Sequence, residues 1–309
     1  MRAHSQFPWT AAVVAAAAAA LLLAGAPGEG GGQVVYRAGQ DIAPAFDGWE
    51  QRPDGTFDLA FGYFNRNWDE KPFVPVGPDN NLEPGGPDQG QPTLFQPRRN
   101  RFVFRIHVPA DFGDREIVWT LTVNGRTNQA YGSLLPGYIT DSELQQFDIG
   151  DFGHNNEEMR ANLAPTVRVE GSLRRTVAVG QPLELAAVAA DDGIPPVHAA
   201  PLRLVGRHGA WGLRVAWIVY RGSESHVSFD PYQFKTYPDY RSNSPWTPGW
   251  EPPPLPSDGR FPVAATFSRP GEYVIRAQAH DGGLKDTADV AVTVTARQEA
   301  PSPDRPDRE

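Results

Sequence analysis

The chain has 309 residues, a formal net charge of −9, and 31 residues each of glycine and proline. This length is typical of two domains, and a hydrophobic content of 40% excludes a disordered chain and a protein with many membrane spans. Cysteine is absent, which excludes disulfides, thiolate zinc sites, iron–sulfur clusters and cysteine nucleophiles. The acidic excess lies almost entirely in residues 27–164 and neither half is basic, so we expect no nucleic-acid partner.

Residues 1–26 have the order of segments of a secretory signal peptide. Arg2 and His4 precede an apolar run over residues 11–24, and small residues follow through Ala26. This run is short compared with the roughly 20 residues that span a bilayer, which favours cleavage over an uncleaved anchor. We therefore expect an exported, periplasmic or extracellular protein with no membrane span after cleavage, and a flexible leader over residues 27–42.

Residues 43–137 are predicted to form an N-terminal β-sandwich. Apolar and polar residues alternate with a period of two, as in half-buried strands, in segments 56–64, 101–108 and 115–123. Asn124 and Gly125 then predict a tight hairpin, because both central residues of a type I′ turn need positive φ. The return strand is expected at residues 127–134.

Residues 65–100 form a long loop rich in proline and glycine, and such loops are usually functional or mobile. Within it, residues 79–85 carry oxygen ligands at alternate positions, but a proline and a missing distal glutamate favour a plain surface loop over a calcium loop. The basic segment 98–101 favours arginines that pair with local acids over a site for an anionic ligand. Residues 138–163 are acidic, and we expect a linker with one short helix near 157–163.

Residues 164–296 change to a run of short strands, which is typical of an immunoglobulin-like sandwich. The predicted strands are 166–169, 177–179, 183–189, 213–219, 263–267, 273–279 and 288–295. Trp217 is expected on the inner face of a central strand, where such domains often bury a tryptophan. Tyr273 is expected to form a tyrosine corner, with its hydroxyl returning to nearby backbone, and Ile275 stands where antibody domains have a cysteine.

Several segments of this half together resemble bacterial PKD and cadherin-like repeats. They are Ala164-Pro165-Thr166-Val167, Gly180-Gln181-Pro182-Leu183, Asp191-Asp192-Gly193, Pro270-Gly271-Glu272-Tyr273, Asp281-Gly282 and Val290-Ala291-Val292-Thr293-Val294. The strand Ala216-Trp217-Ile218-Val219-Tyr220 departs from the aspartate- and glycine-rich segment of PKD repeats, so the wider immunoglobulin-like class is the safer assignment. The resemblance implies a binding, spacer or adhesive module, and the first half resembles no family of known activity.

Four aspartates are candidate calcium ligands in the second half: Asp191, Asp192, Asp281 and Asp286. The loops that hold them are expected to emerge at the same end of the sandwich, and converging carboxylates bind hard cations. The alternative, which we favour, is that these aspartates form turns and cap local backbone N–H groups.

A proline-rich insertion over residues 221–260 carries candidate ligand-binding aromatics: Tyr232, Tyr237, Tyr240, Trp246 and Trp250. Exposed aromatic rings can bind a protein partner or stack on sugar rings. The insertion can equally fold its aromatics back onto a sheet or onto the first domain, and this self-packing is the interpretation we favour.

Standard catalytic and phosphate-binding motifs are missing, including the GxSxG, HExxH and GxxxxGK[ST] patterns. We expect no catalytic residues and no cofactor other than calcium. The sequence thus predicts an exported, monomeric, all-β protein with two sandwich domains and a disordered tail over residues 297–309. Its expected role is non-catalytic binding or structure at the bacterial cell envelope, with an envelope protein or polysaccharide as partner. The alternative is a carbohydrate-binding or glycoside-hydrolysing secreted protein that uses the 232–250 aromatics.

Overall fold

The computed structural model describes residues 36–149, 157–202 and 209–297, which belong to one compact unit beginning at Tyr36. The predicted signal peptide, most of the leader and nearly all of the predicted tail lie outside the described residues. No helix within those ranges is both long and apolar enough to cross a membrane.

The first sandwich consists of two three-stranded sheets, in the orders β1-β2-β4 and β3-β5-β6. Its strands are β1 (Ile42–Gln51), β2 (Phe57–Asn65), β3 (Asn80–Glu83), β4 (Arg98–Val108), β5 (Ile117–Val123) and β6 (Arg126–Gly132). The ring of Phe104 lies 5.5 Å from that of Phe61 on the neighbouring strand and 5.0 Å from that of Trp119 on the facing sheet. These three rings form the centre of the first core.

Two strands of the first sandwich were not predicted. In β1, Pro44 and Gly48 interrupt the alternation, and the pairing of β1 with β2 shifts register between Phe46 and Gly48. Both residues are tolerated because β1 is an edge strand of its sheet. Strand β3 has only four residues and lies within the 65–100 loop, where it pairs with β5, so that part of the loop is ordered as sheet.

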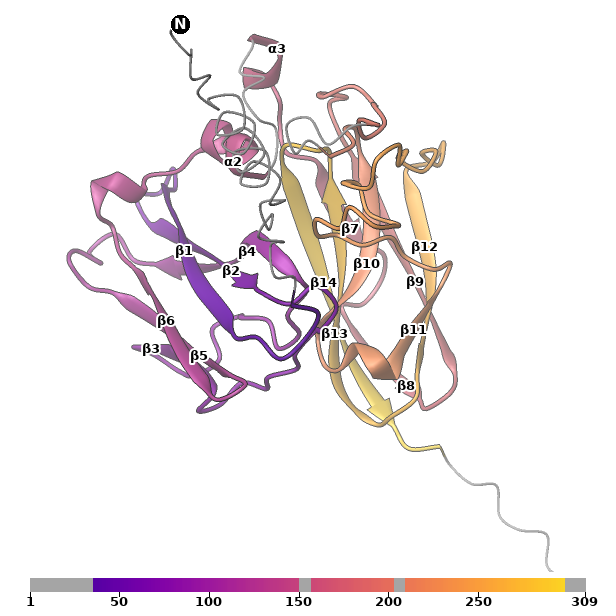
Figure 1. The fold of residues 1–309 in the computed structure, drawn as a ribbon, viewed down its shortest axis with the longest axis horizontal. Coiled ribbons are helices and arrows are strands. Elements are labelled where there is room, and N and C mark those ends of the chain that lie inside the picture. Colours follow the sequence, from indigo (N-terminus) through magenta and orange to yellow (C-terminus); the bar gives the residue numbers. More distant parts are fainter. Residues whose placement is uncertain (1–35, 150–156, 203–208, 298–309) are drawn as a thin grey trace, which may run out of the picture. The chain divides into compact units, whose positions relative to one another are not determined.

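The second sandwich consists of two four-stranded sheets, in the orders β10-β13-β14-β8 and β11-β12-β9-β7 (Figure 1). Its strands are β7 (Thr166–Val169), β8 (Arg174–Ala178), β9 (Pro182–Ala190), β10 (Arg214–Arg221), β11 (Val227–Asp230), β12 (Arg260–Phe267), β13 (Gly271–His280) and β14 (Lys285–Thr295). Trp217 and Ile275 are buried in its core. The Tyr273 hydroxyl donates to the Arg269 carbonyl at 3.1 Å, which is the expected tyrosine corner. The prediction of an all-β protein with two sandwiches, the second immunoglobulin-like, is confirmed.

Short helices lie between the sandwiches along the chain. They are the 3₁₀ turn η1 (Pro136–Tyr138) and the helices α2 (Ser142–Ile149) and α3 (Glu157–Arg160), and a second 3₁₀ turn, η2 (Glu224–His226), follows β10. Helix α3 falls where one short helix was expected, and α2 was not anticipated.

Strand β4 carries a wide bulge where it pairs with β2. Phe61 pairs with Phe104 and Tyr63 pairs with Asn100, so residues 101–103 stand opposite Gly62 alone. The buried carboxylate of Asp47 stabilises the bulge by accepting the Phe102 N–H at 2.6 Å and pairing with Arg99. Burial raises the pKa of Asp47, although Arg99 opposes the shift. Because residues 101–103 leave the ladder, their carbonyl groups are available to other donors.

Candidate functional site

The four aspartates proposed as calcium ligands all cap backbone N–H groups. Asp192 accepts the Ile194 N–H at 2.9 Å, and Asp286 accepts the Val167 N–H at 2.9 Å. Asp191 accepts the Gly193 N–H at 3.1 Å. Within the described residues no group of three or more His, Asp or Glu side chains is placed to hold a metal ion. Asp191 and Asp192 therefore correspond to the turn-forming alternative, whereas Asp286 caps an N–H group 119 positions away.

Asp281 is the most deeply buried of the four aspartates. Its Oδ1 accepts the N–H groups of Gly283 and Leu284 at 2.6 Å each, and its Oδ2 accepts Nδ2 of Asn162 at 3.1 Å. Burial raises the pKa of Asp281 to about 6, against the opposing effect of these hydrogen bonds. Asp281 therefore ties the β13–β14 turn to the segment that precedes β7.

The five aromatics of the 221–260 insertion do not form one exposed face. Tyr232 is 81% exposed, whereas Tyr237 and Trp246 are only 5% and 9% exposed. Tyr240 is partly buried, and so is Trp250, whose ring packs against Phe234 with 5.3 Å between centroids. A sugar ring cannot stack on the buried members, and the arrangement is the one expected from self-packing.

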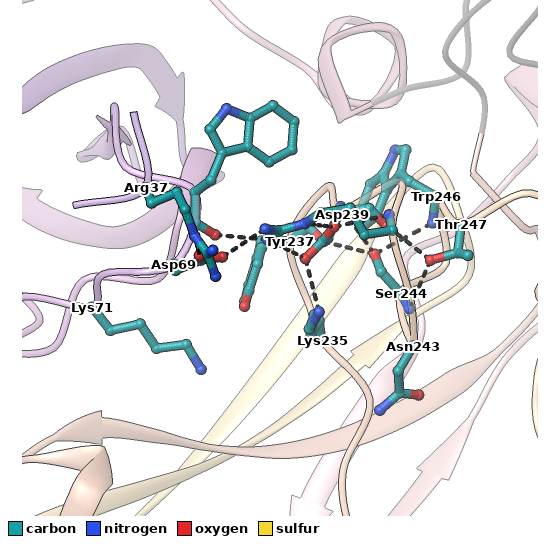
Figure 2. A network of polar contacts seen from close by, with 12 residues as sticks. Arg37, Asp69, Lys71, Lys235, Tyr237, Asp239, Asn243, Ser244, Trp246 and Thr247 are labelled. Carbon is teal, nitrogen blue, oxygen red and sulfur yellow. Dashed lines mark hydrogen bonds and ion pairs between the residues drawn. The ribbon is translucent and has the colours of Figure 1, made fainter. Parts of the chain in front are cut away.

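A buried carboxylate, Asp239, organises the insertion (Figure 2). It accepts hydrogen bonds of 2.8 Å from Lys235 Nζ and Arg241 Nε, while its backbone carbonyl accepts the Thr247 hydroxyl at 2.9 Å. Burial alone would raise the pKa of Asp239, but the hydrogen bonds from Arg241 and Lys235 outweigh it and lower the pKa to about 2. The Ser244 hydroxyl donates to the Tyr237 carbonyl at 2.8 Å, which closes the loop on itself.

Arg241 also attaches the insertion to the first half of the chain. Its guanidinium donates to Asp69 Oδ1 at 2.7 Å and to the Trp68 carbonyl at 3.0 Å, and it lies over the Trp68 ring. Asp69 in turn accepts Arg37 Nε at 2.6 Å. These hydrogen bonds hold the insertion against the start of the 65–100 loop.

The end of the same loop packs against β10. The N–H groups of Thr93 and Leu94 both approach the Tyr220 carbonyl, at 3.3 and 3.4 Å. Arg221 binds the Asp88 carboxylate through two nitrogens, at 2.9 and 2.7 Å. The Leu94 side chain is buried within the core cluster of the second sandwich. The first half of the chain therefore contributes a residue to the core of the second.

The third contact is made by the β4 bulge. Its Arg101 carbonyl accepts Lys285 Nζ at 2.6 Å, and its Val103 carbonyl accepts Arg276 Nη1 at 2.8 Å. Arg276 also forms two hydrogen bonds with Asp289, at 2.7 and 2.8 Å, and its guanidinium lies over the Tyr220 ring, 3.4 Å from the ring centroid. The carbonyl groups that the bulge frees are thus satisfied by cations of β13 and β14.

The contacts between the two sandwiches, such as those of Leu94 and Arg276, could not be predicted from the sequence. Arg276 alternates with core residues on β13, a pattern that ordinarily places a charged side chain in solvent. Leu94 and Phe95 form an isolated apolar pair among polar and proline residues, which is too short to show the periodicity that marks core positions. The sequence signal for both residues was therefore the same as for ordinary surface and loop positions.

The sequence matches no protein-family model and no curated protein. Solved structures with a similar fold include a titin M10 and obscurin-like 1 immunoglobulin complex, at 16% identity and a TM-score of 0.24, covering 45% of this chain and 99% of that one. Fibronectin(III)-like modules of CbhA from Clostridium thermocellum match at 11% identity and a TM-score of 0.23, covering 89% and 98%. Domains 4 and 5 of the surface layer protein SbsC match at 11% identity and a TM-score of 0.23, covering 59% and 66%. At such low TM-scores these similarities support no argument about function.

Proposed function

We propose that this chain is an exported, non-catalytic protein of the bacterial cell envelope in which two β-sandwiches act as one rigid structural or binding module. The proposal combines the segment order of residues 1–26 with the contacts between the sandwiches. Its second half is proposed to be a relative of PKD and cadherin-like repeats. The module is proposed to act as a monomer toward an envelope protein or polysaccharide.

One observation carries the proposal, namely the burial of Leu94 from the first half in the core of the second sandwich. Sandwiches that are joined by a flexible linker usually meet through a small polar surface, which allows them to move. A shared core residue does not permit such motion, because hinge opening would expose Leu94 and leave a void in the second core. Rigidity of this kind suits a protein that sets a distance or presents a surface.

The alternative of a glycan-binding or hydrolytic protein has less support from the geometry. Two of its five proposed ring contacts, Tyr237 and Trp246, are buried. In addition, Asp239 of the same insertion is fully enclosed and used in ion pairs with Lys235 and Arg241, so it is not available to a substrate.

Scanning calorimetry of the mature protein tests the rigid module. We expect one transition whose calorimetric and van't Hoff enthalpies agree, because two sandwiches that share a core residue should unfold together. Leu94→Ala should lower the melting temperature, whereas Leu202→Ala, at an exposed position, should leave it unchanged. Two separate transitions in the unaltered protein would refute the proposal, and turnover of any polysaccharide by the pure protein would refute its non-catalytic part.

A further inference from the structure

A cavity of about 480 Å³ lies where β4, the segment around helix α2 and the β13–β14 turn meet. Its volume is within the roughly 300 to 1,000 Å³ of small-molecule sites. Two cationic side chains line it, Arg105 from β4 and Lys285 from β14. No motif of the sequence pointed to this place. It lies outside the aromatic insertion, and it adjoins Asp281, which binds the lining residues Asn162 and Leu284.

Each of the two cations donates to a neutral acceptor. Lys285 Nζ donates to the Arg101 carbonyl, and Arg105 Nη2 donates to Gln145 Oε1 at 3.1 Å. Neither side chain forms an ion pair with a carboxylate in the described part of the chain. Two cations without ion-pair partners that line one cavity are a recognition site for a negatively charged oxygen pair, such as a carboxylate.

The lining also contains hydrogen-bond acceptors. Asn162 is 2% exposed and uses its Nδ2 to bind Gln146 and Asp281, but its Oδ1 has no hydrogen-bond partner. This oxygen has almost no accessible surface, so the acceptors that a ligand can reach are carboxylates elsewhere in the lining. The carboxylates of Glu50 and Asp141 also line the cavity. These acceptors favour a ligand with hydroxyl groups, and the two carboxylates disfavour a dianion such as phosphate.

We propose that this cavity binds a small polyhydroxylated carboxylate of the sugar-acid class. The ligand carboxylate contacts Lys285 and Arg105, and its hydroxyl groups donate to Glu50 and Asp141. Leu284 and Ala164 provide a small apolar wall for the C–H face of the ligand. This binding goes beyond the proposed structural role, which would stand unchanged if the cavity proved empty.

The surroundings of Lys285 make such binding dependent on pH. Burial lowers the pKa of Lys285 to about 7, the charges of Arg276, Arg105 and Arg99 act in the same direction, and Asp47 opposes them. Of the other titratable groups nearby, His280 on β13 is buried with its pKa well below the usual value, so it adds no positive charge near neutral pH. A bound carboxylate favours the ammonium form, so binding takes up a proton. Affinity should therefore increase as the pH falls through 7.

Isothermal titration calorimetry of the full mature chain with D-glucuronate tests the proposal, with D-glucose and inorganic phosphate as comparison ligands. We expect glucuronate to bind more tightly than either, with an affinity about tenfold higher at pH 6 than at pH 8, following the protonated fraction of a group whose pKa is near 7. Absence of glucuronate binding at millimolar concentration would overturn the proposal. Equal binding of phosphate would overturn the assignment to sugar acids.

Two variants locate the site. Arg105→Gln removes an exposed side chain whose one hydrogen bond in the described residues is to Gln145, so folding should be preserved and glucuronate affinity should fall. Lys285→Met should abolish both the binding and its pH dependence. Arg174→Gln, at an exposed position of β8, is the matched control and should bind as the unaltered protein does. Unchanged binding in Arg105→Gln and Lys285→Met, with melting temperatures confirming that both are folded, would place the ligand elsewhere and refute the proposal.

Discussion

Arg276 on β13 donates a hydrogen bond of 2.8 Å to the carbonyl oxygen of Val103, a residue 173 positions earlier in the chain. The acceptor is available because Val103 belongs to the β4 bulge and has no partner in the β2–β4 ladder. The donor is held in place by Asp289 and by the Tyr220 ring. The β4 bulge of the first sandwich therefore provides an acceptor through which the second sandwich is attached.

Replacing Arg276 by methionine should destabilise the whole protein. The change leaves the partly buried Val103 carbonyl unpaired and removes the contact with Tyr220, which together should lower the free energy of unfolding by about 2 to 4 kcal/mol. Urea denaturation measures the loss. Arg174→Gln should change the same quantity by less than about 0.5 kcal/mol. A loss below about 1 kcal/mol for Arg276→Met would mean that the contacts of Arg276 stabilise the protein much less than their geometry indicates.

The β4 bulge itself can be tested at Gly62. A Cβ at this position would collide with the Asp47 carboxylate, the Asn100 carbonyl and the Arg99 guanidinium. Gly62→Ala should therefore lower the free energy of unfolding by about 1 to 3 kcal/mol, as overpacking does. At Gly86 an added Cβ meets nothing within 4 Å, so Gly86→Ala is the control and should be nearly neutral. Equal stability of the two variants would show that the bulge yields to the added methyl group.

The insertion is expected to respond unequally to removal of its two tyrosines. Tyr237→Ala removes a buried ring and should lower the free energy of unfolding by about 3 kcal/mol or more. Tyr232→Ala removes a ring that is 81% exposed and should cost less than about 0.5 kcal/mol. Thermal melting followed by circular dichroism distinguishes them. A destabilised Tyr232→Ala variant would show that this ring is covered in solution.

The burial of Tyr237 and the exposure of Tyr232 could not be predicted from the sequence, whereas several strands could. Strands such as β2 and β5 were predictable, because alternate residues face one core. The insertion has no such period, and its fold depends on one buried carboxylate, Asp239, whose partners Lys235 and Arg241 are ordinary surface residue types in the sequence. The cavity around Lys285 depends on segments distant along the chain, so its acceptors and donors meet only in three dimensions.

Asp281 should give the protein a measurable dependence on pH. Its pKa of about 6 in the folded protein is above the ordinary value of 3.8, so between these two pH values the folded state holds a proton that the unfolded state has lost. Stability from this group therefore increases as the pH falls from 7 toward 5, by about 1 kcal/mol. In Asp281→Asn this contribution is missing, while the hydrogen bonds to Gly283 and Leu284 can persist.

Urea denaturation of both proteins at pH 5, 6 and 7 measures this contribution. The stability of the unaltered protein relative to Asp281→Asn should rise on acidification, and taking the difference between the two removes the effect of all other titrating groups. A difference that stays constant, or one that changes in the opposite direction, would show that Asp281 is already ionised at pH 5.

The burial of Leu94 in the second sandwich limits how this architecture can be duplicated in evolution. Tandem immunoglobulin-like domains arise by duplication, because each domain contains its complete hydrophobic core and can be copied alone. Here the interior of the second sandwich is completed by a residue from the preceding half, and the edge of β10 is covered by the same segment. A gene fragment for the second sandwich alone would encode an incomplete interior. The pair is therefore a single hereditary unit, to be copied or lost whole.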